Sequence, residues 1–288
     1  MSDFRVGRLA VIGVGLIGGS LALALKEAGC VDEVVGCGRG KPNLETALNL
    51  GIIDRYERDP QKAVADADIV FLATPVRSLA TTVAEIAPAL KQGTIITDGG
   101  SVKAEVLREI IPLLPAGVHF IAGHPIAGTE NSGAEAAFST LYNGKRCILT
   151  PDALTDAQAL ETVTRMWQAA GSEVVCMDAE KHDRVLAAIS HLPHMVAYSL
   201  VNAVGSYDHY EENILEYSAG GFRDFTRIAS SDPTMWRDIA LMNQDALLEM
   251  MGQFETFFAE LKEDVRKGDA DRLFEFFMRS KQMRDAIL

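Results

Sequence analysis

The stretch that decides the fold is Gly13-Val14-Gly15-Leu16-Ile17-Gly18-Gly19-Ser20. A β-branched run at residues 9–12 precedes it, and an amphipathic helical pattern follows it through Leu25. Glycines at this spacing let the backbone turn tightly and approach a pyrophosphate, whose charge is favoured at the N-terminus of the next helix. Because strand, glycines, helix and second strand fall within about 30 residues, we predict dinucleotide binding rather than a structural turn. The expected cofactor contacts here are Gly13, Gly15, Leu16, Ile17 and Gly18.

The residues after the second predicted strand bear on the choice of cofactor. NAD enzymes usually present Asp or Glu there to the ribose 2′-hydroxyl, but this chain has Gly38-Arg39-Gly40-Lys41. A guanidinium can grip a 2′-phosphate, so Arg39 favours NADP over NAD. The alternative is a solvated Arg39 beside bound NAD. Gly38, Arg39 and Thr74 complete the expected cofactor contacts.

Short β-branched runs alternate with helical patterns as far as residue 178, which predicts an α/β domain with a doubly wound, Rossmann-type parallel sheet. The predicted strands are residues 9–12, 33–37, 69–73, 94–97, 119–122, 146–149 and 173–176. Beyond residue 178 only the helical period continues. Several of these helices are apolar over too wide a face to be buried within one chain. We therefore expect a dinucleotide-binding domain at 1–178 and an all-helical substrate-binding and dimerisation domain at 179–288.

Composition excludes several classes of protein. Forty acidic residues against 27 basic ones give a net charge of −13, which repels a nucleic-acid backbone. The apolar runs are shorter than the roughly 20 residues of a membrane span, and no signal-peptide pattern opens the chain, so we expect a cytoplasmic protein. The four cysteines form no C-x-x-C pair, which predicts reduced, mostly buried thiols and no metal site.

Two predicted strand ends carry candidate catalytic side chains. Residues 94–103 read TIITDGGSVK, with Ser101 as the expected N-cap of the next helix. Residues 119–130 read HFIAGHPIAGTE, a strand leading into a loop that holds His124. A loop histidine alone is usually a surface residue. Because ligands bind at the carboxyl edge of parallel strands, and imidazole is the usual proton acceptor near pH 7, we predict that His124 is a catalytic base.

In the helical half, polar residues recur on one predicted helix face: Asp183, Ser190, His191 and His194. Such groups need either buried hydrogen bonds or a ligand. A metal site is the alternative, but His-x-x-His lacks the spacing and the nearby acid of zinc-protease helices.

A second stretch of the helical half, residues 220–229, carries two arginines. Arg223 and Arg227 lie one turn apart beside Asp224. One could pair with that aspartate, which would leave the other for a substrate carboxylate.

Four longer motifs occur in a fixed order behind the glycine-rich stretch: GSVK at 100–103, GHPIAGTE at 123–130, SHLPH at 190–194 and GGFRDFTRIASSDPTMWRD at 220–238. Together they resemble the prephenate and arogenate dehydrogenase (cyclohexadienyl dehydrogenase) family of tyrosine biosynthesis over nearly the whole chain. The resemblance implies oxidation of prephenate or arogenate at C4 of the ring. The ring carboxylate leaves as CO2 and a hydride passes to NAD(P)+.

The same resemblance implies roles for individual residues. His124 would accept the proton of the C4 hydroxyl, and Ser101 would orient that hydroxyl and the imidazole. Arg227 would bind a substrate carboxylate. The residues expected to complete or gate the pocket are His194, His191, Glu130, Asp183 and Trp236.

Two other classes of protein are weighed against this one. A β-hydroxyacid dehydrogenase would carry a lysine base where this chain has Ser190 to His194, and a catalytically inactive dinucleotide sensor would lack a working site. We expect no chorismate mutase segment before the glycine-rich stretch and no regulatory ACT domain after Lys267. We therefore expect any inhibition by tyrosine to act at the active site. The preference between prephenate and arogenate is left open.

Overall fold

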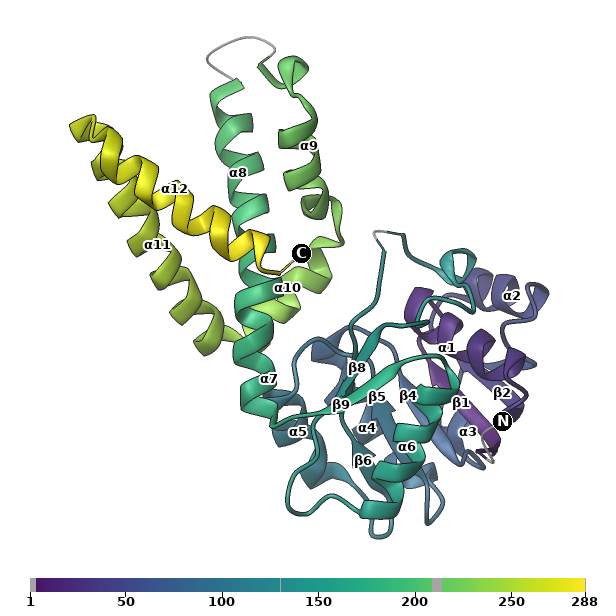
Figure 1. Cartoon of the computed structure of the whole chain (residues 1–288). Coiled ribbons are helices and arrows are strands. Elements are labelled where there is room, and N and C mark those ends of the chain that lie inside the picture. The colour runs from purple at the N-terminus through teal and green to yellow at the C-terminus, as the bar shows by residue number, and fades with distance from the viewer. Residues whose placement is uncertain (1–3, 130, 209–213, 288) are drawn as a thin grey trace. The chain divides into compact units, whose positions relative to one another are not determined.

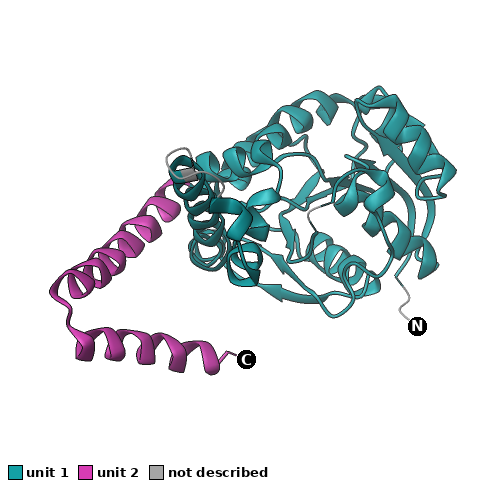
Figure 2. Cartoon of the chain, turned by 90° about the horizontal axis from the view of Figure 1, so that it is seen from above, with its two compact units in different colours: residues 1–243 teal, residues 244–288 magenta. Residues whose placement is uncertain are grey.

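The computed structural model describes residues 4–129, 131–208 and 214–287 (Figure 1). The chain separates into two compact units, residues 1–243 and residues 244–288, which Figure 2 colours separately. The first unit contains both sheets and the helices that follow them. The predicted division into 1–178 and 179–288 stays a prediction.

The first unit begins with a six-stranded parallel sheet in the order β3-β2-β1-β4-β5-β6. Its elements are β1 (Val6–Ile12), α1 (Leu16–Glu27), β2 (Val31–Cys37), α2 (Lys41–Asn49), β3 (Arg55–Glu57), α3 (Pro60–Val64), β4 (Ile69–Leu72), α4 (Leu79–Ile86), β5 (Ile95–Asp98), α5 (Ala104–Ile110) and β6 (His119–Ile121). The strand order reverses beside β1, where open α/β sheets bind ligands. The prediction of a Rossmann-type sheet followed by helices is confirmed.

A second, three-stranded sheet continues the chain: β7 (Gly123–Pro125), β8 (Arg146–Leu149) and, after α6 (Ala157–Ala169), β9 (Glu173–Cys176). β7 is antiparallel to β8 and β8 is parallel to β9. The last two predicted strands therefore do not extend the first sheet. The prediction that His124 lies in a loop was also wrong. The chain stays extended after β6, and His124 pairs with Ile148 of β8. A strand of three residues is too short to show a period in the sequence.

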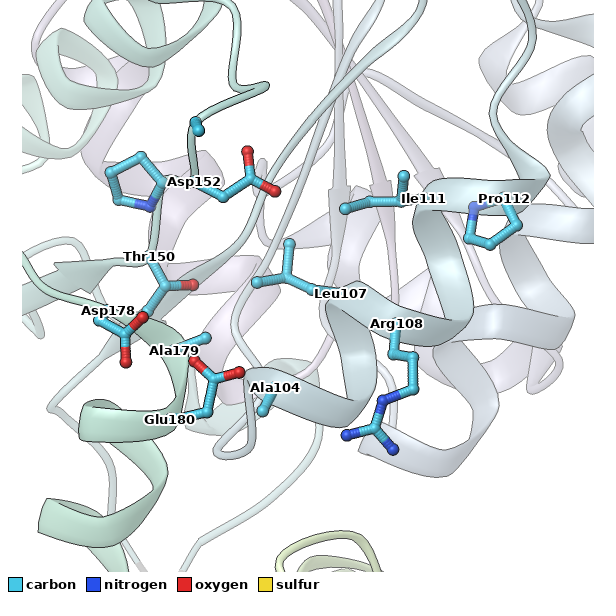
Figure 3. Close-up of a pocket in the computed structure, with 12 residues that line it drawn as sticks. Ala104, Leu107, Arg108, Ile111, Pro112, Thr150, Asp152, Asp178, Ala179 and Glu180 are labelled. Carbon is cyan, nitrogen blue, oxygen red and sulfur yellow. The ribbon is translucent and has the colours of Figure 1, made fainter.

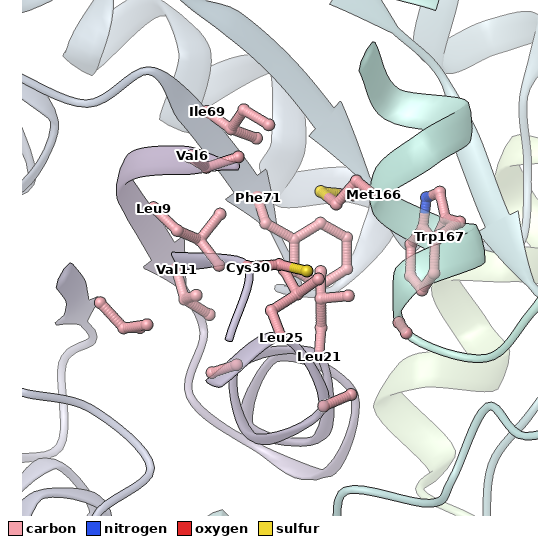
Figure 4. Close-up of a cluster of buried hydrophobic side chains, with 14 of the residues drawn as sticks. Val6, Leu9, Val11, Leu21, Leu25, Cys30, Ile69, Phe71, Met166 and Trp167 are labelled. Carbon is pink, nitrogen blue, oxygen red and sulfur yellow. The ribbon is translucent and has the colours of Figure 1, made fainter. Parts of the chain in front are cut away.

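The first sheet is held between two apolar clusters. In one of them α1 and α6 meet over β4: Leu21, Leu25, Phe71 and Trp167 converge in Figure 4. The ring of Trp167 meets that of Phe71 edge to face, with centroids 5.6 Å apart. Removing a fully buried aromatic ring of this kind costs about 3–5 kcal/mol, so this contact fixes α6 on the sheet.

Several helices follow β9 within the first unit. In chain order they are α7 (Ala179–Leu186), the π-helical turn η5 (Ala187–His191), α8 (Leu192–Asp208), the 3-10 helix η6 (Ile214–Tyr217), α9 (Gly220–Thr226), the 3-10 helix η7 (Arg227–Ser230) and α10 (Pro233–Met242). The π turn at η5 breaks the single helix face expected from Asp183 to His194. Trp236 and Ile239 of α10 are buried in the second apolar cluster, with residues of β1, β4 and β5. This burial explains why the helices as far as Asn243 group with the sheet.

The second unit consists of α11 (Gln244–Lys267) and α12 (Ala270–Asp285), which contact each other. Asp269 accepts a hydrogen bond from the Arg272 amide and so caps α12. Both helices expose large apolar side chains: Leu248, Phe254, Phe257, Phe258, Val265, Phe274, Phe277 and Met283. Across the described residues of the whole chain, no helix combines the length and the apolar character that a membrane span needs.

Candidate active site

A cavity of about 1070 Å³ opens at the carboxyl ends of β1, β2 and β4, and residues of α10 also line it. Five predicted cofactor contacts are among its lining residues: Gly13, Gly15, Gly38, Arg39 and Thr74. Leu16, Ile17 and Gly18 do not line it; they belong to the first turn of α1 behind the glycines.

The glycines explain why this turn can approach a ligand. Gly13 has φ +99°, and a Cβ there would lie 2.5 Å from the Ala73 carbonyl oxygen. A Cβ on Gly18 would lie 2.2 Å from the Gly13 carbonyl oxygen, so Gly18 serves the packing of α1 against the turn. Gly15 begins α1 without a side-chain cap. The turn and the cavity therefore fit the phosphates of a dinucleotide.

Guanidinium groups gather in this cavity although the chain is acidic. Arg39, Arg58, Arg77 and Arg237 line it, together with Glu85 and Asp238. Arg237 donates to Asp238 over 2.8 Å, whereas Arg39 is exposed. Arg58 follows strand β3, which was not predicted, so the sequence could not indicate that Arg58 lines the same cavity as Arg39. This local charge favours a polyphosphate ligand.

His124 lies on β7, directly after Gly123, whose amide donates to Asp98 at the carboxyl end of β5. β5 pairs with β4, where Leu72 is opposite Asp98. His124 is 8% exposed, and its Nδ1 lies 2.8 Å from Nε2 of His182. Burial lowers the pKa of His124 well below its usual value, and the neighbouring charges of His182, Lys103 and His191 act in the same direction. The imidazole is therefore neutral at pH 7, as a proton acceptor must be.

A buried ion pair holds the backbone before His124. Lys103 and Asp98 are both fully buried and form a salt bridge. The Lys103 ammonium also donates to the Gly123 carbonyl over 2.7 Å, and Asp98 accepts the Gly123 amide at 3.0 Å. Both polar backbone groups of Gly123 are thus fixed by one pair of opposite charges.

Asp183 of α7 reaches across to the start of α5. Its carboxylate accepts the amides of Lys103 and Ala104, each at 2.9 Å, and lies 2.7 Å from Nδ1 of His182. The expectation that Ser101 caps α5 was wrong, because Lys103 is the N-cap residue and the carboxylate comes from another helix. The resemblance implied that Ser101 orients the His124 imidazole, but within the described part of the chain no hydrogen bond joins the two residues.

Three further predicted residues form a group on α8, η5 and α10. The ring of His194 stacks on that of Trp236, with centroids 3.6 Å apart, and its Nδ1 donates to the Ser190 carbonyl. His191 is buried, and burial lowers its pKa to about 4. Its Nδ1 accepts from the Asn243 amide, which also donates to the carbonyl oxygen of Asp183. The structure thus brings His191, His194, Trp236 and Asp183 together.

The two arginines differ in their surroundings. Arg227 begins η7 and is exposed. The pKa of His194 is lowered first by burial of its own ring and further by the positive charge of Arg227. Arg223 donates to the Ser218 hydroxyl over 3.2 Å, and no ion pair joins it to Asp224 within the described ranges. Glu130, also predicted at the pocket, lies outside the described residues.

A second cavity of about 500 Å³ lies between α5, the end of β8 and the start of α7 (Figure 3). Its charged lining consists of Asp152, Asp178, Glu180 and Arg108. None of the predicted site residues is in it, and its acids would repel an anionic substrate. No group of three or more His, Cys, Asp or Glu side chains in the described part of the chain could hold a metal ion. All four cysteines are free thiols.

Comparison with known families gives a match for each of two long stretches of the chain. The family described as "Prephenate dehydrogenase, nucleotide-binding domain" matches residues 21–176, and "Prephenate dehydrogenase, dimerization domain" matches residues 178–279. The chain belongs to the prephenate dehydrogenase family.

Relatives within the prephenate dehydrogenase family match the chain over almost its full length. Cyclohexadienyl dehydrogenase of Zymomonas mobilis is 42% identical over 97% of this chain and 95% of its own. Prephenate dehydrogenase of Aquifex aeolicus, solved with hydroxyphenyl propionate and NAD+, is 36% identical, with a TM-score of 0.93 over 100% of both chains. Synechocystis arogenate dehydrogenase is 28% identical, with a TM-score of 0.80 over 98% of this chain and 100% of its own.

Three residues of this candidate site could not be predicted from the sequence: Asp98, Lys103 and His182. Asp98 and Lys103 lie within the stretch 94–103 quoted above, but the sequence did not predict a role for either of them. His182 adjoins Asp183, yet nothing in the sequence pairs it with His124, which is 58 positions away. Only the packing of α7 against the start of α5 brings them together.

Proposed function

We propose that this protein catalyses the oxidative decarboxylation of prephenate, arogenate or both, with hydride transfer to NAD(P)+, in tyrosine biosynthesis. The observation that carries the proposal is the buried, neutral imidazole of His124. The residue before it, Gly123, donates its amide to Asp98 at the carboxyl end of β5, and β5 pairs with β4, whose carboxyl end borders the glycine-lined cavity. A dinucleotide enzyme that oxidises a ring alcohol needs such a base beside its cofactor.

The chain's own residues would carry the proton chemistry. His124 accepts the proton of the C4 hydroxyl while a hydride leaves C4, and the lost ring carboxylate departs as CO2. The product ring is aromatic, which makes the step effectively irreversible. When bound, NAD(P)+ supplies the hydride acceptor, and Gly13, Gly15 and Thr74 are the residues that would hold it.

Roles for the substrate-binding residues are also part of the proposal. Arg227 would bind a carboxylate of the dianionic substrate, and the stacked pair His194 and Trp236 would form a wall of the pocket. The carboxylate of Asp183 is already used by two backbone amides and by His182. We therefore infer that Asp183 positions other groups and does not bind substrate. Ser101 keeps its proposed contact with the substrate hydroxyl.

We propose NADP as the preferred cofactor. No acid follows β2, and Arg39 and Arg58 line the cavity that begins at Gly13. The Aquifex aeolicus relative was solved with NAD+, so NAD is the competing outcome of the assay.

We further propose a homodimer formed through residues 179–288. The support is the number of large apolar side chains that α11 and α12 expose and the match of residues 178–279 to a dimerization domain. The expected cytoplasmic location stays a prediction.

The test is a set of initial rates with both substrates, each with NAD+ and with NADP+, on wild type and on His124→Asn. We expect turnover with at least one of the four combinations and a loss of kcat in the variant. A folded protein that turns over none of them contradicts the proposal. If prephenate then raised the Tm only in the presence of NADP+, the chain would be an inactive sensor.

A further inference from the structure

Three side chains form a continuous chain of hydrogen bonds behind the site. Asp183 and His182 are neighbours on α7, with Oδ1 of the carboxylate 2.7 Å from Nδ1 of the imidazole. The opposite ring nitrogen of His182, Nε2, lies 2.8 Å from Nδ1 of His124 on β7. His182 is completely buried, so no water competes for these two bonds. Each bond needs one donor and one acceptor, and this requirement fixes the protons.

The first proton is fixed by Asp183. Its carboxylate already accepts the backbone amides of Lys103 and Ala104, as an ionised group does, and an ionised carboxylate can only accept. Nδ1 of His182 therefore carries the hydrogen. Burial lowers the pKa of His182, although its hydrogen bond to the Asp183 carboxylate acts in the opposite direction. His182 is thus neutral, and its Nε2 is left as an acceptor.

The second proton follows from the first. Because Nε2 of His182 accepts, Nδ1 of His124 must donate. His124 is itself neutral, so its Nε2 holds a lone pair. No other described residue forms a hydrogen bond with that Nε2. The lone pair is therefore available to the proton of a substrate hydroxyl.

We propose that His182 is a positioning residue, which, with Asp183 behind it, holds His124 as the Nδ1–H tautomer so that Nε2 serves as the base. This inference rests on the proposed function, because it assigns a proton to the residue that function uses. The proposal also means that His182, and not Ser101 as the sequence resemblance implied, orients the imidazole of His124.

The charged and titratable groups around this chain come from four elements. Lys103, before α5, and His191, on η5, face His124. Asp183 on α7, Asp98 at the end of β5 and Lys103 face His182. All of these groups are buried and hold hydrogen bonds of their own.

The direct test reads the tautomer by NMR. Long-range proton–nitrogen correlations of the full-length protein, labelled at its histidine nitrogens, distinguish a ring nitrogen that bears hydrogen from one that does not. The signals of His124 are assigned by their loss in His124→Asn. We expect wild-type His124 to be protonated at Nδ1 near neutral pH. Protonation at Nε2 overturns the proposal.

Variants of His182 add a kinetic test. His182→Leu removes the acceptor and should lower kcat about ten- to a hundredfold while KM for either substrate changes less than about twofold. His182→Gln can still accept from His124 and donate to Asp183, so it should recover most of kcat. The matched control is His119→Gln. His119 is the first residue of β6, at the end of that strand farther along the chain from His124, so this variant should leave kcat unchanged.

Two kinetic outcomes overturn the proposal: wild-type kcat in His182→Leu, or a His182→Gln variant as slow as His182→Leu. If His182→Leu fails to fold, the wild-type spectrum and His182→Gln still decide. If the protein oxidises neither prephenate nor arogenate, the proposed function fails, while the tautomer of His124 is still read from the spectrum.

Discussion

The ammonium of Lys103 lies 2.7 Å from the carbonyl oxygen of Gly123, the residue before the proposed base. Lys103 is paired with Asp98 in a region without solvent. One buried charge pair thus connects the start of α5 to the strand that carries His124.

Removing half of that pair should destabilise the fold. Lys103→Met leaves Asp98 buried and unpaired, and we expect the free energy of unfolding to fall by about 3–5 kcal/mol, measured by urea denaturation. The double variant Lys103→Met with Asp98→Asn should recover part of this loss, because no charge is then left alone. A single variant as stable as wild type would contradict the importance given to the pair.

The choice of cofactor should respond to the turn after β2. Gly38 has room for a side chain, since a Cβ there would lie 3.7 Å from the nearest atom, Cδ2 of Leu44. Gly38→Asp with Arg39→Ser should move the ratio of kcat/KM values at least about tenfold toward NAD+, because a charge-assisted hydrogen bond contributes roughly 1.5–3 kcal/mol.

The control for this change is Lys41→Ser. Lys41 pairs with Glu45 and does not line the cavity, so the cofactor ratio should not move. An unchanged ratio in the Gly38 and Arg39 variant would remove the case for NADP.

Arg227→Ala should weaken substrate binding. A carboxylate that loses its guanidinium partner costs roughly 1.5–3 kcal/mol, so KM should rise about tenfold or more while cofactor affinity is retained. Arg223→Ala is the matched control, because Arg223 is held by Ser218 on the same segment. A larger rise of KM in Arg223→Ala, with folding intact, would mean that the two arginines have been assigned the wrong way round.

The apolar surface of the second unit should be covered in solution. Sedimentation at micromolar concentration should give a species of about twice the chain mass of 31.2 kDa, and Phe258→Glu should weaken it. Leu154→Glu changes an exposed residue of the first unit and should have no effect. A single species at the chain mass would contradict the proposed dimer.

The glycine-rich stretch could be interpreted from the sequence because its residues act locally. The turn at Gly13, the strand before it and the helix after it are neighbours along the chain, so their spacing carries the information. Arg39 could be placed for the same reason, since it directly follows β2. The predicted strands at 146–149 and 173–176 were also found, although the sequence could not indicate that they form a separate sheet.

The support for His124 could not be predicted in the same way. His182 and Asp183 lie on α7, whereas Lys103 precedes α5 and His124 is on β7, so these residues meet only after the chain has folded. The helical period suggested one polar face, but a buried hydrogen-bond network and a ligand site give the same pattern in a sequence. Asp183 proved to hold backbone amides and His182, and the π turn at η5 could not be predicted from spacing.

The central claim is that His124 is the base, and the pH dependence of kcat/KM tests it most directly. A base must be neutral to accept a proton, and burial lowers the pKa of His124. The rate should therefore hold as pH falls through the usual histidine value of about 6.5, and decline only below it. In His124→Asn, kcat should drop about 10²–10⁴-fold and this acid limb should flatten, with cofactor affinity unchanged. An acid limb that persists in His124→Asn with the same midpoint would contradict the account, because the titrating base would then be another group.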